Sequence, residues 1–259
     1  MIKEPIEKIY KELYQLDEHQ IKTKNYALYF DTLKKGSFDN KKPTYLFDVD
    51  HTLLNINELK DRFNEAFAKY NKVFSPDVWQ ATYKEAKSRE NFYDFSLHIA
   101  ILSKKIDGKA KTKSELINLM QKTILEIIPD IIHPNLFWQI NAEKDHINLV
   151  LATAGDTTYH RMKVEALIAY LPVLPQTIIY IEKTDKGDVV NELYKHFRLP
   201  DDHEIYVFDD NPSELEDIHQ KCPRKKIHLI RVRQPNGHYN HKIAANLIRS
   251  EEWNFINQS

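Results

Sequence analysis

Short apolar runs separated by amphipathic segments make up the second half of the chain. Runs rich in Ile, Leu and Val lie at residues 147–152, 178–181, 205–208 and 227–230. Between them, apolar side chains recur every three or four positions at residues 158–170, 188–197 and 213–221. This alternation predicts an α/β fold built from βαβ units, with a parallel sheet buried on both faces. An earlier apolar run, residues 44–47, predicts a further strand of the same sheet.

The region from residue 56 to about residue 130 predicts helices and no strands. Helical spacing of i, i+4, i+8 and i+11 is found for Leu59, Phe63, Phe67 and Tyr70. A second helix is expected to begin after Ser75, its N-cap, because Pro76 follows directly. Residues 114–127 predict another helix. The aromatic side chains of this region are interpreted as packing core rather than as a ligand site.

The N-terminal segment predicts a single amphipathic helix. Apolar residues stand at positions 6, 9, 10 and 13, which share one helical face. A polar, basic stretch at residues 34–42 contains Gly36 and is typical of a loop. Residues 1–40 are therefore expected to form a helical extension that packs on the core.

Composition narrows the class of protein. The chain has 259 residues, 42% of them hydrophobic, and a formal net charge of −1, so no overall field favours nucleic acid or an anionic membrane as a partner. Five glycines leave no Gly-rich dinucleotide or phosphate loop. The first seventeen residues lack the apolar core of a secretory signal, and one cysteine permits no internal disulfide. We expect a cytoplasmic protein with no membrane partner.

Candidate chemistry begins at the end of the strand at residues 44–47. The sequence there continues Asp48-Val49-Asp50-His51-Thr52. Alternate residues of an extended chain point the same way, and carboxylates this close repel unless a cation or a shared proton relieves them. One alternative is a loop in which Asp50 or Thr52 caps a helix. A calcium-binding EF-hand loop is excluded, because Leu53 and Leu59 occupy its glycine and glutamate positions.

Polar residues also follow the other predicted strands. Thr153 follows the strand at 147–152, Lys186 precedes a predicted helix after the strand at 178–181, and the strand at 205–208 ends in Asp209-Asp210. In a parallel sheet these positions share the carboxyl-terminal edge, where ligands bind. Taken singly, Thr153 is better explained as a helix cap, and for Asp209 the alternative is a cap of the helix that follows Pro212.

In their order, these four features resemble the motifs of the haloacid dehalogenase-like (HAD) superfamily: Asp-x-Asp-x-Thr, Thr or Ser, Lys, and an acidic pair. The resemblance covers residues 44–54 and 148–232. It implies a Rossmann-like core at residues 41–56 and 133–259. The long helical stretch between Asp48 and Thr153 then resembles a C1 cap, which we place at residues 57–132.

The resemblance also implies roles for the site residues. Asp48 would attack phosphorus and form an aspartyl-phosphate, and Asp50 would act as acid and then base. Thr153 and Lys186 would bind the phosphoryl oxygens, with Lys183 as the alternative lysine. The implied cofactor is Mg²⁺, which hard oxygen ligands suit.

The implied ligands of that Mg²⁺ are the Asp48 carboxylate, the backbone carbonyl of Asp50 and the acidic pair. A form of the last motif has an acid four positions after its aspartate, and this matches Asp210 and Glu214. Asp210 is therefore the expected direct ligand, with Asp209 in the outer shell. His51 is expected at the solvent edge, with contact to the site as the alternative. The pair His238 and His241 is expected at the surface, with a weak metal-binding pattern as the alternative.

The function predicted from the sequence is a Mg²⁺-dependent phosphomonoester hydrolase that acts on a small phosphorylated substrate. Asp50 argues against dehalogenation, because halide needs no proton to leave. A phosphomutase, a protein phosphatase or a HAD-like binding protein without turnover are the alternatives. Substrate specificity is expected in the cap, where the candidate residues are Lys84, Lys87, Arg89, Asn91 and Tyr93.

Overall fold

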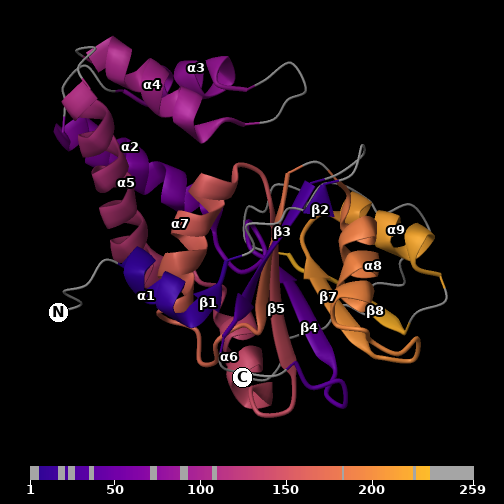
Figure 1. Cartoon of the computed structure of the whole chain (residues 1–259). Coiled ribbons are helices and arrows are strands. Elements are labelled where there is room, and N and C mark those ends of the chain that lie inside the picture. The colour runs from indigo at the N-terminus through magenta and orange to yellow at the C-terminus, as the bar shows by residue number, and fades with distance from the viewer. Residues whose placement is uncertain are drawn as a thin grey trace.

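The structure is a computed structural model of the whole chain (Figure 1). It describes residues 6–16, 21–22, 27–34, 38–70, 75–87, 93–106, 110–182, 184–223 and 226–233. No helix in these ranges is long and apolar enough to cross a membrane.

A single mixed sheet forms the centre of the molecule. Its strand order is β1 (Tyr14–Gln15), β3 (Ala27–Leu33), β6, β5, β4, β7 and β8, and β2 (Ile21–Lys22) pairs with β3 beside this path. The parallel strands are β4 (Thr44–Asp48), β5 (Asn148–Ala154), β6 (Thr177–Ile181), β7 (Ile205–Asp209) and β8 (Ile227–Arg231). All five strands were predicted from the apolar runs, and the α/β fold class is confirmed.

Helices that connect the strands cover both faces of the sheet. They are α6 (Pro134–Glu143), α7 (Thr157–Ile168), α8 (Lys186–His196) and α9 (Pro212–Lys221). Successive residues of β4 and β5 face opposite layers: Phe47 and Leu151 belong to one buried cluster, and Leu46 and Val150 to the other. A strand buried on both faces must be apolar throughout, which is why these strands read as continuous apolar runs.

The first four of the described helices between β4 and β5, which precede α6, form what we call the helical insert: α2 (Ile56–Tyr70), α3 (Pro76–Glu85), α4 (Phe95–Ile106) and α5 (Ala110–Ile131). In Figure 1, α2 and α5 lie alongside one another and lead away from the sheet to α3 and α4. The predicted cap of α3 is confirmed, since the Ser75 side chain accepts a hydrogen bond from the Val78 N–H.

The two connections to the helical insert are hydrogen-bonded to each other. The Asn55 N–H donates to the Ile131 carbonyl at 2.9 Å, and the His133 N–H donates to the Leu53 carbonyl at 2.8 Å. The insert therefore enters and leaves the core at one place, immediately after the loop that carries Asp50.

The expectation that residues 1–40 form a purely helical extension is wrong. It contains α1 (Ile6–Leu13), but also β1 (Tyr14–Gln15), β2 (Ile21–Lys22) and β3 (Ala27–Leu33). Strand β3 pairs antiparallel with β6 and so extends the core sheet beyond its parallel part. Polar residues interrupt the apolar pattern of β3, which is why it was missed.

One of those polar residues, Asp31, is fully buried. It accepts two hydrogen bonds from the Arg161 Nη2 atom of α7, at 2.8 and 3.0 Å, and one from the Tyr10 hydroxyl of α1 at 2.8 Å. A buried charge is tolerated only when it is paired and hydrogen-bonded. Asp31 thus joins the N-terminal segment to α7 through polar contacts rather than apolar ones.

Replacing Asp31 by Asn should lower the free energy of unfolding by about 3 kcal/mol, because Arg161 loses its partner while its surroundings stay the same. Urea unfolding of the wild type and of Asp31→Asn measures the difference. Glu7→Gln serves as the control, since its ion pair with Lys11 lies at the surface and should contribute less than about 1 kcal/mol. Equal stability of Asp31→Asn and wild type would contradict the structural role of this contact.

Candidate active site

The carboxyl ends of β4 and β7 and the start of α8 meet at one edge of the sheet. Lys186, the first residue of α8, donates a 2.6 Å hydrogen bond to Asp48 Oδ1 at the end of β4. The same ammonium group contacts Asp209 Oδ2 at the end of β7. All three side chains are almost completely buried. Three residues predicted from distant motifs therefore form one hydrogen-bonded cluster.

The electrostatics of this cluster are unbalanced toward negative charge. Burial raises the pKa of the Asp48 carboxyl, and although the Lys186 ammonium opposes this, Asp209 raises it further. Burial also raises the pKa of Asp210 to about 7, with Asp209 as the second cause. Lys186 is held in its charged form, since Asp209 and Asp48 outweigh the effect of its burial and raise its pKa. One lysine thus faces three buried carboxylates.

The two acids of the pair differ in how they are hydrogen-bonded. Asp209 uses both oxygens: Oδ2 accepts from Lys186, and Oδ1 accepts from the Asn211 N–H at 2.8 Å. Asp210 Oδ2 is buried and has no hydrogen-bond partner among the described residues, although the Asp210 N–H donates to the Thr52 hydroxyl at 3.0 Å. A buried carboxylate oxygen without a donor needs another source of positive charge.

A divalent cation fits this arrangement. Asp48, Asp209 and Asp210 each offer a carboxylate oxygen, and these atoms lie within 4.8 Å of one another. Hard oxygen donors at this spacing suit Mg²⁺, and the unpartnered oxygen of Asp210 supports the expectation that Asp210 is the more direct ligand. Asp209, by contrast, is already engaged by Lys186.

The Asp50 carboxylate lies apart from these acids. Both of its oxygens accept hydrogen bonds from the Lys163 ammonium of α7, at 2.5 and 2.6 Å. Burial raises the pKa of Asp50, but the charge of Lys163 outweighs it and lowers the pKa to about 2. Asp50 is therefore ionised in this structure. The expected contact of its backbone carbonyl with a metal stays a prediction.

Thr153 lies inside β5, so its interpretation as a helix cap is wrong; Asp156 caps α7 and accepts from the Tyr159 N–H at 2.9 Å. The Thr153 hydroxyl contacts His160 Nδ1 at 2.5 Å. Burial lowers the pKa of His160 to about 3, so the imidazole is neutral. Gly155 makes this contact possible, because a Cβ at that position would collide with the His160 ring.

His160 and Lys163 are site residues that the sequence interpretation missed. Their spacing of three positions places them on one face of α7, next to the strand that carries Thr153. Lys163 is fully buried in the structure, and in the sequence it stands between two apolar residues, Met162 and Val164. Burial is not visible in a sequence, so this lysine resembled an ordinary surface residue.

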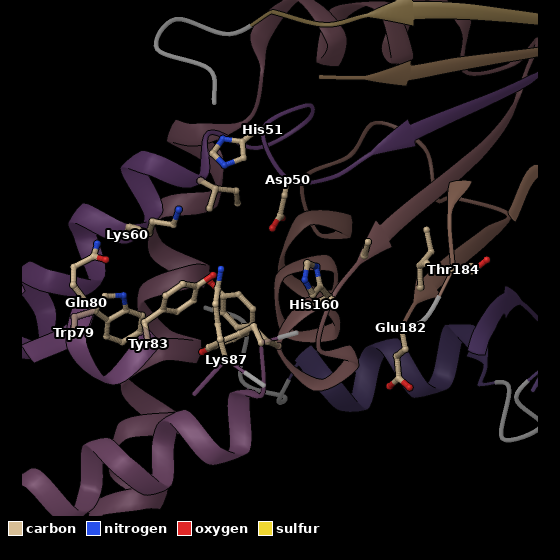
Figure 2. A pocket seen from close by; sticks show the side chains of 16 residues that line it. Asp50, His51, Lys60, Trp79, Gln80, Tyr83, Lys87, His160, Glu182 and Thr184 are labelled. Carbon is tan, nitrogen blue, oxygen red and sulfur yellow. The ribbon is translucent and has the colours of Figure 1, made fainter. Parts of the chain in front are cut away.

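A cavity of about 450 Å³ opens between the core and the helical insert. Figure 2 shows Asp50 and His160 on its core side, with Lys60 of α2 and Tyr83 of α3 opposite them. His51, which is half-buried, also lines this cavity. Such cavities of a few hundred cubic ångströms are typical of small-molecule sites.

The cap residues proposed from the sequence separate into three groups. Lys87 and Tyr93 line the cavity, whereas Lys84 is exposed and does not. Several other candidate positions lie outside the described residues: Arg89, Asn91, Lys183, His238 and His241.

The interpretation of Asp209 as a helix cap is wrong, because Asn211 caps α9.

Of three comparisons with known proteins, the one with solved structures agrees with this fold. No family model matches the chain, and the search of curated proteins finds no match. Among solved structures, a protein of Burkholderia xenovorans described as a haloacid dehalogenase-like hydrolase superposes with a TM-score of 0.55. The two sequences are 14% identical, and the match covers 81% of this chain and 90% of that one.

Two further structures give lower scores. A protein of Thermotoga maritima described as a β-phosphoglucomutase has a TM-score of 0.48 at 13% identity, covering 76% of this chain and 88% of its own. CbbY of Rhodobacter sphaeroides, in complex with xylulose 1,5-bisphosphate, has a TM-score of 0.47 at 15% identity, with 82% and 92% covered. At these scores they add nothing to the fold assignment.

The chain therefore has the haloacid dehalogenase-like fold: a Rossmann-like core with a helical insert after the first strand of its parallel sheet. The resemblance deduced from the motifs is confirmed for the fold.

Proposed function

We propose that this protein is a Mg²⁺-dependent phosphomonoester hydrolase and that Asp48 is its nucleophile. The observation that carries the proposal is the cluster at the sheet edge, in which Asp48 lies beside Lys186, Asp209 and the unpartnered oxygen of Asp210. A phosphate ester is an anion, so a carboxylate can approach it only where positive charge is concentrated. The helical insert would act as a cap over this site.

In the first half of the reaction, an oxygen of Asp48 attacks phosphorus and the bond to the leaving oxygen breaks. The phosphoryl group is then carried by Asp48 as an acyl phosphate. In the second half, water attacks phosphorus, phosphate departs and the carboxylate is restored. Lys186 and the Thr153 hydroxyl would bind the phosphoryl oxygens, where negative charge shifts during transfer.

Asp50 would handle the protons of both steps. In its ionised form beside Lys163 it is ready to accept a proton from the attacking water. To protonate a leaving alkoxide it must first gain a proton, and the Lys163 ammonium is the donor in direct contact with it. A leaving group that is stable as an anion, such as p-nitrophenolate, needs no such proton.

Mg²⁺ would be held by Asp48 and Asp210, with Asp209 behind them and the Asp50 carbonyl as a further ligand. The bound ion supplies positive charge that offsets the repulsion between an anionic nucleophile and an anionic substrate. Buried carboxylates outnumber cations in the cluster, and this surplus of negative charge supports the proposed metal site.

Hydrolysis of p-nitrophenyl phosphate tests the chemistry. We expect release of p-nitrophenol that requires Mg²⁺ and stops with a chelator. Asp48→Asn should lower kcat by at least about 10³-fold, because the amide is not a nucleophile. Asp202→Asn, an exposed aspartate in a turn before β7, is the matched control and should be as active as the wild type.

Two outcomes would contradict the proposal. Full activity in Asp48→Asn would exclude Asp48 as nucleophile, and a folded protein without hydrolysis across a broad panel of phosphate esters would exclude the hydrolase. A phosphomutase would instead return an isomer of a sugar phosphate and little free phosphate. Catalysis of dehalogenation is disfavoured by the presence of Asp50.

Metal binding can be tested apart from turnover. Mg²⁺ should raise the Tm of the wild type, because the ion binds the folded cluster and relieves repulsion among its carboxylates. In Asp210→Asn the Tm without metal should be higher than that of the wild type, since one buried charge is removed, and Mg²⁺ should raise it less. Differential scanning fluorimetry measures both. An identical Mg²⁺ response in the two proteins would contradict the assignment of Asp210.

A further inference from the structure

The wall of the cavity formed by the helical insert carries two lysines that have no acidic partner among the described residues. Lys60 of α2 and Lys87, which follows α3, both line the cavity and are half-buried. Within the described part of the chain, Lys60 makes no hydrogen bond or ion pair through its ammonium group. The ammonium of Lys87 lies 5.1 Å from the centre of the Tyr83 ring and contacts no carboxylate there.

Placing two half-buried lysine cations on one cavity wall is energetically unfavourable when no anion is bound. Burial lowers the pKa of Lys60, and the charges of Lys163 and Lys87 lower it further, while Asp50 acts in the opposite direction. A partly buried lysine normally extends its ammonium to water or meets a carboxylate. Two of them facing one cavity indicate that an anion completes the arrangement.

The carboxylates that line the cavity, Asp50 and Glu182, form no ion pair with these two lysines. Asp50 is already neutralised, because both of its oxygens accept hydrogen bonds from Lys163. Glu182 lies across the cavity in Figure 2, and its oxygens accept from Thr157 at 2.9 Å and from Tyr29 at 3.1 Å. Glu182 keeps its charge but makes no ion pair with Lys60 or Lys87 in the described part of the chain, so the positive charge of the insert wall remains available to a bound molecule.

The rest of the wall defines what else that molecule presents. Trp79 and Tyr83 contribute aromatic surface, and Gln80 adds an amide that can donate a hydrogen bond. In Figure 2, Lys60, Gln80 and Tyr83 stand on the side of the cavity opposite Asp50. The positive wall therefore faces Asp50, which lies two residues after Asp48, across this cavity.

We propose that the substrate carries a second anionic group, a carboxylate or a phosphate, which Lys60 and Lys87 bind while the scissile phosphoryl group faces Asp48. This proposal rests on the proposed function and specifies its substrate class: a small phosphomonoester with negative charge at both ends. The lysines act on binding and orientation; they are not assigned to the chemical step.

Matched substrate pairs that differ only in the distal group test the proposal. Suitable pairs are glycerol 3-phosphate with 3-phosphoglycerate, sorbitol 6-phosphate with 6-phosphogluconate, and fructose 6-phosphate with fructose 1,6-bisphosphate. In the wild type, kcat/KM for the doubly anionic member of the pair that fits should exceed that of its partner by about tenfold or more. In Lys60→Gln and Lys87→Gln this ratio should fall toward one.

Lys84→Gln is the matched control, because Lys84 belongs to α3 but is exposed and lies outside the cavity. Its preference for the doubly anionic member should equal that of the wild type. A wild-type ratio near one in every pair would overturn the second subsite. So would an equal loss of kcat/KM for both members in Lys60→Gln and Lys87→Gln, since that would signify a general effect on folding or charge.

Binding without turnover separates this proposal from the proposed function. Titration calorimetry of Asp48→Asn with the same pairs, in the presence of Mg²⁺, should show about tenfold tighter binding of the doubly anionic member. The double variants Asp48→Asn/Lys60→Gln and Asp48→Asn/Lys87→Gln should lose that difference. Hydrolysis of p-nitrophenyl phosphate with no such difference in binding would overturn the subsite alone. A binding difference without any hydrolysis would overturn the proposed hydrolase and retain the subsite.

Discussion

The repulsion among three buried carboxylates at one edge of the sheet is the constraint on which the rest of the site depends. Asp48, Asp209 and Asp210 converge because β4 and β7 are neighbouring parallel strands that end at the same level. Lys186 bridges two of the three acids, and the third keeps an oxygen without a donor. Such a cluster weakens the fold unless a cation binds there, and the same electrostatic need makes it suited to phosphoryl chemistry.

Around this edge, polar contacts from α7 fix the remaining groups. Lys163 holds Asp50 and His160 contacts Thr153, so a single helix sets the position of two of the candidate catalytic side chains. The same helix is joined to the N-terminal segment through Arg161 and Asp31. The N-terminal segment thereby supports the site, although none of its described residues belongs to the site.

The parallel part of the fold and the acidic cluster could be predicted from the sequence, because both follow from strand periodicity. Apolar runs mark strands buried on both faces, and residues after them share one edge of the sheet, so Asp48, Lys186 and Asp209 could be placed together without coordinates. The antiparallel strand β3 could not be predicted, because Asp31 and Thr32 break its apolar pattern. The residues that hydrogen-bond to these two side chains are remote in sequence. The roles of Lys60 and Lys163 could not be predicted for a related reason. Whether a lysine points to solvent or into the interior depends on tertiary packing, not on the local sequence pattern.

The most direct test of the account is detection of the phosphorylated enzyme. Wild-type protein mixed with p-nitrophenyl phosphate and Mg²⁺, quenched in acid within the first turnover and examined by mass spectrometry, should gain the mass of one phosphoryl group on the peptide that contains Asp48. Asp48→Asn should gain none. Turnover with no such adduct at any quench time, or an adduct on a different peptide, would contradict the assignment of Asp48 as the nucleophile.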